Sequence, residues 1–162
     1  MNPVGLTTRR AWLCAAAVLL SACAQKPLRP PQGGWSGRMS LQVDSEPGQS
    51  FFAGFDLRGD PQTGELALYT PWGSTLAVLA WTPGSATLTA EDKVRSFSSL
   101  DVLLTRVTGA PIPVGALFDW LAGRASAVPG WQPDLSQLAQ GRLSALRTQP
   151  LPSAELRLVL DK

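Results

Sequence analysis

The sequence predicts a mainly β domain of the α+β class, in which an antiparallel meander comes first and two helices precede the last strands. Three observations predict this class. Apolar and polar residues alternate in most segments between residues 35 and 97 and again after residue 130, which is typical of half-buried strands. Short turns rich in Pro and Gly separate these segments, as in antiparallel hairpins. Between them, residues 98–123 carry apolar side chains at helical spacing.

The first six strands are predicted from this alternation and from the turns between them. The first begins at Trp35, where Met39, Leu41 and Val43 alternate with polar neighbours. A turn at Glu46-Pro47-Gly48 ends it. The next five strands are expected over residues 51–57, 65–70, 74–81, 85–90 and 93–97. Because consecutive strands are joined by only a few residues, we expect an antiparallel meander.

Two helices and three further strands complete the domain. The first helix is capped by Ser98 or Ser99 and stops at Gly109. The second opens at the segment Ile112-Pro113-Val114 and ends at Gly123. After a turn at Pro129-Gly130, strands are expected over residues 131–137, 141–147 and 154–161.

The N-terminus predicts a bacterial lipoprotein. Arg9 and Arg10 precede an apolar run at residues 11–22, which is too short to span a bilayer, where about 20 residues are needed, and fits a secretory signal. The run ends in Leu20-Ser21-Ala22-Cys23, which resembles a lipobox and implies a mature chain that starts at an acylated Cys23. Ala24, in place of an aspartate, points by the same resemblance to the outer membrane. The alternative is an ordinary signal peptide with an incidental cysteine.

This reading divides the chain into three parts. Residues 1–22 are a signal peptide, residues 23–34 are the lipidated cysteine with a tether rich in Pro and Gly, and residues 35–162 are the folded domain. Removal of residues 1–22 takes away Arg9 and Arg10 and no acidic residue, so that the remaining 140 residues carry twelve basic and twelve acidic side chains. The excess of positive charge therefore belongs to the signal peptide.

Composition excludes several functions. The chain has no histidine, so Ser-His-Asp or Cys-His catalysis and histidine-ligated metals are excluded. Two cysteines cannot form a thiolate zinc site. A net charge of +2 gives no electrostatic footprint for nucleic acid, and no glycine-rich loop has the pattern of a phosphate-binding motif. We therefore expect no enzyme activity, no catalytic residue, no metal and no cofactor.

The most informative local feature is Trp72, at the centre of the predicted turn Thr70-Pro71-Trp72-Gly73-Ser74. Turns favour Gly, Pro, Asn, Asp and Ser, and Pro71 and Gly73 suit a well-specified turn. Trp72 is either presented outward or buried by a loop that folds back, and the sequence alone does not distinguish these. An exposed Trp on a membrane-tethered protein would favour the bilayer interface.

The remaining aromatic residues mostly fall at core-facing positions of the strands and helices. A filled core is the simplest interpretation. The same apolar set is also what a cavity for acyl chains requires, and sequence cannot separate the two.

Several segments resemble the outer-membrane lipoprotein receptor family LolB. These are Gly37-Arg38-Met39, residues 66–75, residues 108–113 and Trp120-Leu121-Ala122-Gly123, in the order found in that family. The resemblance implies an unclosed antiparallel half-barrel of about eight to ten strands, with two or three helices over its concave face and an apolar cavity between them. It also implies a cofactor-free monomer, anchored in the outer membrane of a Gram-negative bacterium and facing the periplasm.

The resemblance further implies partners and site residues. The partners are the periplasmic carrier LolA, client lipoproteins with their acyl chains, and the outer membrane; no nucleic acid is expected. Cys23 carries the lipid anchor, and Pro71, Trp72 and Gly73 form a hairpin that inserts into the membrane. Seven apolar residues are the candidates that line the acyl cavity: Phe55, Leu66, Leu68, Trp81, Leu103, Phe118 and Trp120.

Two other functions remain open on the sequence. The domain could be a lipid-anchored binding or assembly module that uses its sheet as a protein interface without lipid transfer. An interior cavity that opens near the hairpin would favour transfer, and a packed core would favour the binding module. An envelope hydrolase is the less favoured second alternative, because the chain lacks histidine.

Overall fold

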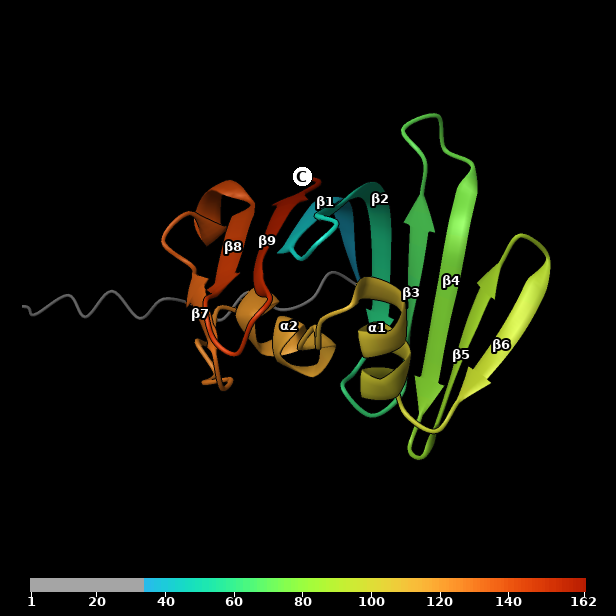
Figure 1. Cartoon of the computed structure of the whole chain (residues 1–162). Coiled ribbons are helices and arrows are strands. Elements are labelled where there is room, and N and C mark those ends of the chain that lie inside the picture. Colours follow the sequence, from blue (N-terminus) through green and yellow to red (C-terminus); the bar gives the residue numbers. More distant parts are fainter. Residues whose placement is uncertain (1–33) are drawn as a thin grey trace, which may run out of the picture.

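The computed structural model describes residues 34–162, so Cys23, the signal sequence and most of the tether lie outside the described residues. Nine strands form a single sheet (Figure 1). The strands are β1 (Trp35–Asp44), β2 (Gln49–Gly59), β3 (Gly64–Tyr69), β4 (Thr75–Thr82), β5 (Ser85–Ala90), β6 (Lys93–Phe97), β7 (Trp131–Asp134), β8 (Arg142–Arg147) and β9 (Ser153–Leu160).

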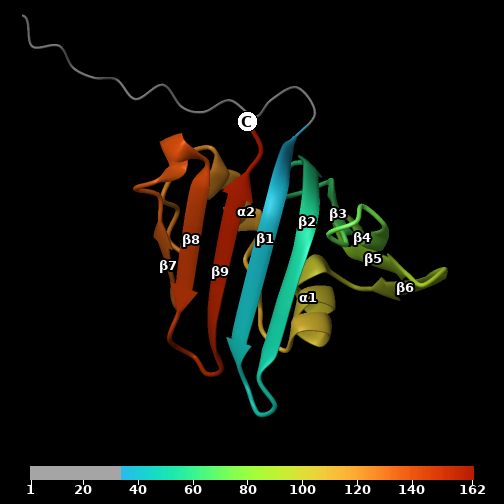
Figure 2. The ribbon, with the colours of Figure 1, turned by 90° about the horizontal axis from the view of Figure 1, so that it is seen from above.

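The sheet is antiparallel and does not close on itself. Its order is β6-β5-β4-β3-β2-β1-β9-β8-β7, so the first six strands follow one another and the last three extend the sheet from the other side of β1. Viewed from above, β8, β9, β1 and β2 lie side by side while β3 to β6 turn away (Figure 2). The sheet therefore curves into a half-barrel, as the resemblance to the LolB family implies.

Two helices lie on the concave side, α1 (Leu100–Thr108) and α2 (Val114–Leu121). The helix α1 packs against β5 and β6. The helix α2 is apolar over most of its surface, and five of its eight residues are buried. Both helices occur where the sequence predicts them, between the sixth and seventh strands.

The N-terminus of α1 shows which of the two candidate serines is the cap. Ser99 has an extended backbone, and its hydroxyl oxygen accepts a hydrogen bond of 3.2 Å from the amide of Val102. At the other end, Gly109 is left-handed with φ of 71°, and its amide donates to the carbonyl of Thr105. Both contacts satisfy groups that a helix terminus otherwise leaves without partners.

Replacement of Ser99 with alanine is expected to lower the free energy of unfolding by about 1 kcal/mol, because the Val102 amide loses its acceptor. Urea denaturation followed by circular dichroism measures this loss. Ser98→Ala is the matched control and should leave the unfolding midpoint unchanged. Equal losses in the two variants would contradict the assignment of Ser99 as the cap.

Two glycines permit close approaches that any side chain would block. A Cβ on Gly37 would lie 2.1 Å from the carbonyl oxygen of Val159 on the neighbouring strand. A Cβ on Gly64 would lie 2.4 Å from the indole ring of Trp81. Gly37 thus lets β1 and β9 pair tightly, and Gly64 makes room for the largest side chain of β4.

One predicted strand is longer than the observed one. The sequence predicts a strand over residues 131–137, but β7 ends at Asp134 and a short 3-10 helix, η1 (Leu138–Gln140), follows. Pro133 lacks an amide donor for the ladder, and the Asp134 carboxylate accepts a hydrogen bond of 2.9 Å from the Ser136 amide. This local turn competes with strand pairing and ends β7 early.

Candidate functional site

The β3–β4 hairpin is held by a dense set of hydrogen bonds at its tip. The amide of Gly73 donates to the Thr70 carbonyl at 2.9 Å, and the amide of Thr70 donates to the Ser74 carbonyl at 2.8 Å. The Thr70 hydroxyl oxygen also accepts from the Ser74 amide at 3.0 Å. Pro71 and Trp72 are the two central residues of the resulting turn, and Gly73 has φ of 86°. The turn is therefore well ordered without any contribution from the indole.

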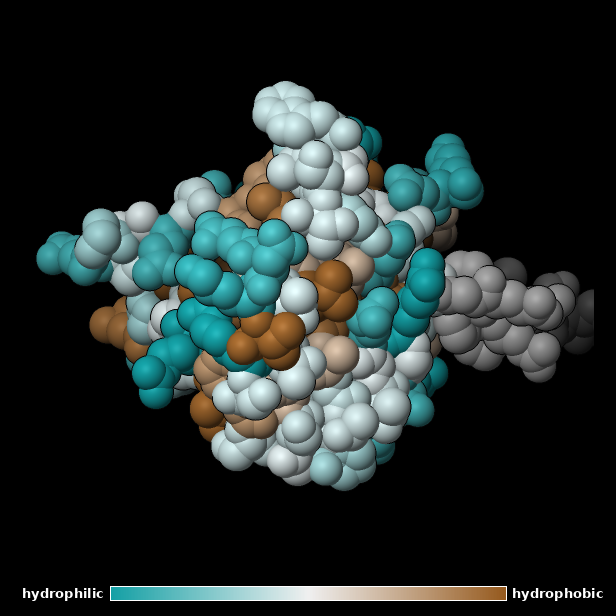
Figure 3. Space-filling view, turned by 90° about the vertical axis from the view of Figure 1, so that its right-hand side faces the viewer, coloured by the Kyte–Doolittle hydropathy of each residue, from teal (hydrophilic) through white to brown (hydrophobic). Residues whose placement is uncertain are grey.

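The structure places Trp72 outside the core. Its side chain is 85% exposed, the highest value among the large apolar residues described. In the space-filling view, the hairpin is the lobe that projects from the top of the molecule (Figure 3). Of the two positions that the sequence left open, the exposed one is observed.

The base of the hairpin is tied to β2 on the outer face of the sheet. The hydroxyl of Tyr69 donates to Asp56 at 3.2 Å, and Arg58 lies 3.8 Å from the same carboxylate oxygen. Burial, and secondly the charge of Asp56, raise the pKa of Tyr69 above its ordinary value, so the phenol stays protonated and keeps donating at neutral pH. These contacts hold the lower part of the hairpin while its tip stays free.

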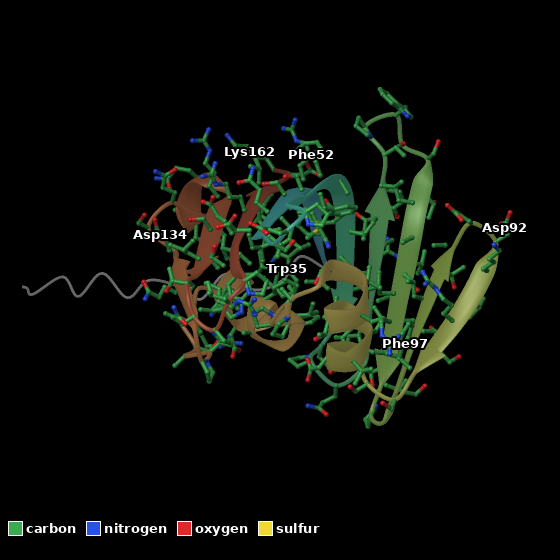
Figure 4. All side chains as sticks on the ribbon, viewed as in Figure 1. Trp35, Phe52, Asp92, Phe97, Asp134 and Lys162 are labelled. Carbon is green, nitrogen blue, oxygen red and sulfur yellow. The ribbon has the colours of Figure 1, made fainter. Side chains whose placement is uncertain are left out.

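The seven cavity candidates lie together in the interior. Six of them are buried, and Leu68 is partly buried and packs against the same cluster: Phe55, Leu66, Leu68, Trp81, Leu103, Phe118 and Trp120. The centre of this arrangement is Phe118 of α2, whose ring makes edge contacts with Trp35 at 5.7 Å and with Trp81 at 6.3 Å between centroids. Trp35 appears between the sheet and the helices in Figure 4.

Trp81 and Trp120, the two Trp residues among the seven candidates, both have hydrogen-bond acceptors for their indole N–H groups. Trp81 donates from Nε1 to the Asp60 carbonyl at 3.2 Å, and Trp120 donates to the Ser126 carbonyl at 3.0 Å. The Asp60 side chain itself accepts from the amides of Thr63 and Gln62, which lowers its pKa. The two Trp side chains are therefore satisfied, packed parts of the interior in this structure.

Two hollows on the described part of the chain lie away from these seven residues. One of about 540 Å³ lies where β1 meets β2 and β9 begins, and includes Val43 and Ala154. The other, of about 290 Å³, lies over β8 and β9 and includes Arg142 and Arg157. None of the seven candidates lines either hollow. The seven candidates instead belong to, or pack against, one continuous cluster of buried apolar side chains.

Sequence reasoning missed one buried polar residue, Arg147. It is only 1% exposed and is the one charged or polar residue in the buried class of residues 34–162. Its Nη2 donates to the Pro152 carbonyl at 2.6 Å, and its guanidinium carbon lies 5.8 Å from the centroid of the Trp131 ring. The sequence does carry a signal for this burial. Arg147 follows Leu143 and Ala145 at a spacing of two residues, so it lies on the same inward face of β8.

Residues 34–162 hold no group of three or more His, Cys, Asp or Glu side chains that could bind a metal ion. Nor does this part of the chain contain a helix long and apolar enough to span a membrane.

An unclosed antiparallel sheet with two helices on its concave side, and an exposed Trp on a projecting hairpin, define a β half-barrel with an apolar interior. The family model described as outer membrane lipoprotein LolB matches residues 34–154. The chain therefore belongs to the LolB family, which confirms the resemblance seen in its sequence.

Curated relatives support this assignment over most of the chain. The outer-membrane lipoprotein LolB of Bordetella petrii is 33% identical over 184 residues, covering 94% of this chain and 92% of that protein. Its namesake in Chromobacterium violaceum is 33% identical and covers 71% of this chain and 68% of the relative. The outer-membrane lipoprotein LolB of Cupriavidus metallidurans is 32% identical, and the match covers 86% of this chain and 72% of that protein.

Proposed function

We propose that this chain is an outer-membrane lipoprotein that receives other lipoproteins from the periplasmic carrier LolA and inserts them into the outer membrane. Membership of the LolB family carries this proposal. The exposed Trp72 at a rigid hairpin tip supports it, because a receptor that delivers acyl chains needs contact with the bilayer. The protein would act without a cofactor and without covalent chemistry.

The N-terminal sequence supplies the attachment. Residues 1–22 act as the signal peptide, Cys23 carries the acyl chains, and the domain begins at residue 35. Two or more acyl chains hold a protein firmly in a bilayer, at about 0.8 kcal/mol for each buried CH₂ group. Eleven residues separate Cys23 from Trp35 and can span roughly 40 Å when extended. The domain therefore stays close to the membrane, on its periplasmic side.

Transfer follows from the free energy of apolar surface in water. Exposed acyl chains are costly in proportion to their area, so they must pass from carrier to bilayer while remaining covered. The apolar interior between the sheet and α2 binds the acyl chains during this transfer. Because Phe118 fills that space in the present conformation, accepting a client requires the helices to move away from the sheet. Transfer of the acyl chains to the bilayer then lowers the free energy, provided that the bilayer binds them more tightly than the receptor does.

The packed interior is also the observation that favours a second function. A lipid-anchored binding or assembly module would keep a filled core and use the outer face of its sheet as a protein interface. That face is polar along β1, where Arg38, Gln42 and Asp44 are exposed. In this reading, acyl chains would never enter the domain.

A transfer assay decides between the two functions. Purified LolA loaded with a fluorescently acylated lipoprotein is mixed with this domain lacking its own acyl chains, and the label is followed by gel filtration. Movement of label to the domain is expected. Label that stays on LolA while the two proteins still bind would contradict transfer and support the binding module.

A further inference from the structure

The guanidinium of Arg147 has donors that the folded chain leaves unused. Nη2 is paired with the Pro152 carbonyl, but Nε and Nη1 are buried without a hydrogen-bond partner among the residues that the structure describes. Residues 34–162 also offer this side chain no ion pair. Buried donors without acceptors destabilise the folded state, and those on a charged group do so more strongly. Because two of its donors are buried and unpaired, Arg147 is a candidate for binding a ligand that carries hydrogen-bond acceptors.

Strand register places Arg147 at one end of the apolar interior. Arg147 is paired with Trp131 on one side and with Ala154 on the other, and Ala154 is in turn paired with Val43. The next inward-facing row, two residues along, contains Ala145, Leu156 and Leu41, and all three are buried. The interior thus has a cationic, donor-rich end that is followed by purely apolar rows.

This end of the interior is adjacent to the surface. Arg147 is the last residue of β8, and residues 148–151, which follow it, are all exposed. A ligand with a polar end could therefore stay near the surface at Arg147 while its apolar part extends inward.

A diacylglyceryl group has the complementary chemistry. Its ester carbonyls are acceptors without donors, and its two chains are apolar. Each ester that enters an apolar interior loses its hydrogen bonds to water, which is unfavourable unless a protein donor replaces them. Charged donors form the stronger bonds.

We propose that Arg147 binds the ester carbonyls of the diacylglyceryl group of a client lipoprotein, through Nε and Nη1, and so fixes which end of the lipid lies at this edge of the half-barrel. The assignment rests on the proposed function, since it takes the interior as the acyl site. Burial also lowers the pKa of the guanidinium, although an arginine stays protonated at neutral pH. Arg147 remains a donor on all its nitrogens.

The test combines a change in the protein with a change in the ligand. The full domain binds either a dipalmitoylglyceryl-cysteine lipopeptide or its dihexadecyl ether analogue, which lacks the two carbonyl oxygens. Affinities are measured by displacement of a fluorescent fatty acid. The wild type is expected to prefer the ester about tenfold, because a hydrogen bond to a charged group is worth 1.5 kcal/mol or more. Without such donors the ether should bind better, since it costs less to remove from water.

Arg147→Met keeps an unbranched side chain of similar length but removes every donor, so the preference for the ester should disappear. Arg147→Lys keeps the charge and should retain part of the preference. Leu143→Met is the matched control on the same face of β8, where Leu143 is also buried, and should retain all of it. Thermal unfolding confirms that each variant is folded.

The outcomes separate this assignment from the proposed function. Equal affinity of the wild type for ester and ether, or an unchanged preference in Arg147→Met, would overturn the role of Arg147 alone. Failure of the wild type to bind either lipid would contradict the acyl site itself, and with it the proposed function. If Arg147→Met does not fold, the preference of the wild type and its reduction in Arg147→Lys still decide the question.

Discussion

Replacement of Trp72 with glutamate is expected to slow the delivery of lipoproteins into vesicles about tenfold or more, while acceptance from LolA stays at the wild-type rate. Insertion of a large apolar side chain into the bilayer is worth roughly 1.5–3 kcal/mol, and every 1.4 kcal/mol is about a factor of ten. A carboxylate at the same position loses this contribution and is repelled by anionic lipids. The turn should persist, because its hydrogen bonds come from the backbone and from Thr70.

The assay uses vesicles with the composition of the outer membrane's inner leaflet and follows labelled lipoprotein by flotation. Leu151→Glu is the matched control. Leu151 is 75% exposed and lies between β8 and β9, in a different loop, so its replacement should leave delivery unchanged. Delivery by Trp72→Glu at the wild-type rate would show that the hairpin does not contribute to membrane contact.

The largest effect on stability is expected from Phe118→Ala. Phe118 is 5% exposed, and its ring contacts those of Trp35 and Trp81 from the opposite layer. Loss of a buried Phe side chain costs about 3–5 kcal/mol, because the transferred area is lost and a cavity remains. A domain of this size has a total stability of about 5–15 kcal/mol, so the variant should be folded but much weakened.

Urea denaturation measures this change as a lower midpoint with an unchanged slope. Val107→Ala is the matched control, since Val107 lies on α1 with 46% of its surface exposed, and it should shift the free energy by less than about 0.5 kcal/mol. A loss for Phe118→Ala no larger than that of Val107→Ala would mean that α2 packs only loosely on the sheet. In that case the interior would be open rather than filled.

Most of the fold was predictable because its signals are local. Alternation along β1 and β9 follows from the period of a strand with one buried face. A serine cap at Ser98 or Ser99 and the stop of α1 at Gly109 follow from the hydrogen-bonding needs of helix ends. The position of Pro71 and Gly73 in the turn has the same local origin.

The features that escaped prediction depend on tertiary contacts. A local pattern specifies the hairpin turn, but whether Trp72 packs back on the domain depends on surfaces distant in sequence. Arg147 is buried because β7 and β9 lie on both sides of it, although a charged residue at a strand end is usually exposed. Likewise, only the packing of Phe118 on two Trp rings distinguishes a filled interior from a lined cavity.

The central place of β1 in the sheet bears on how the domain withstands mechanical load. β1 is the first strand after the tether, and it is paired with β2 on one edge and with β9 on the other. Tension from an anchor at Cys23 would pull along β1 and load two antiparallel ladders in shear, so that many hydrogen bonds resist together. An anchor attached to an edge strand such as β6 would instead open its ladder one bond at a time. A domain tethered through Trp35 would therefore resist mechanical unfolding better than one tethered through an edge strand.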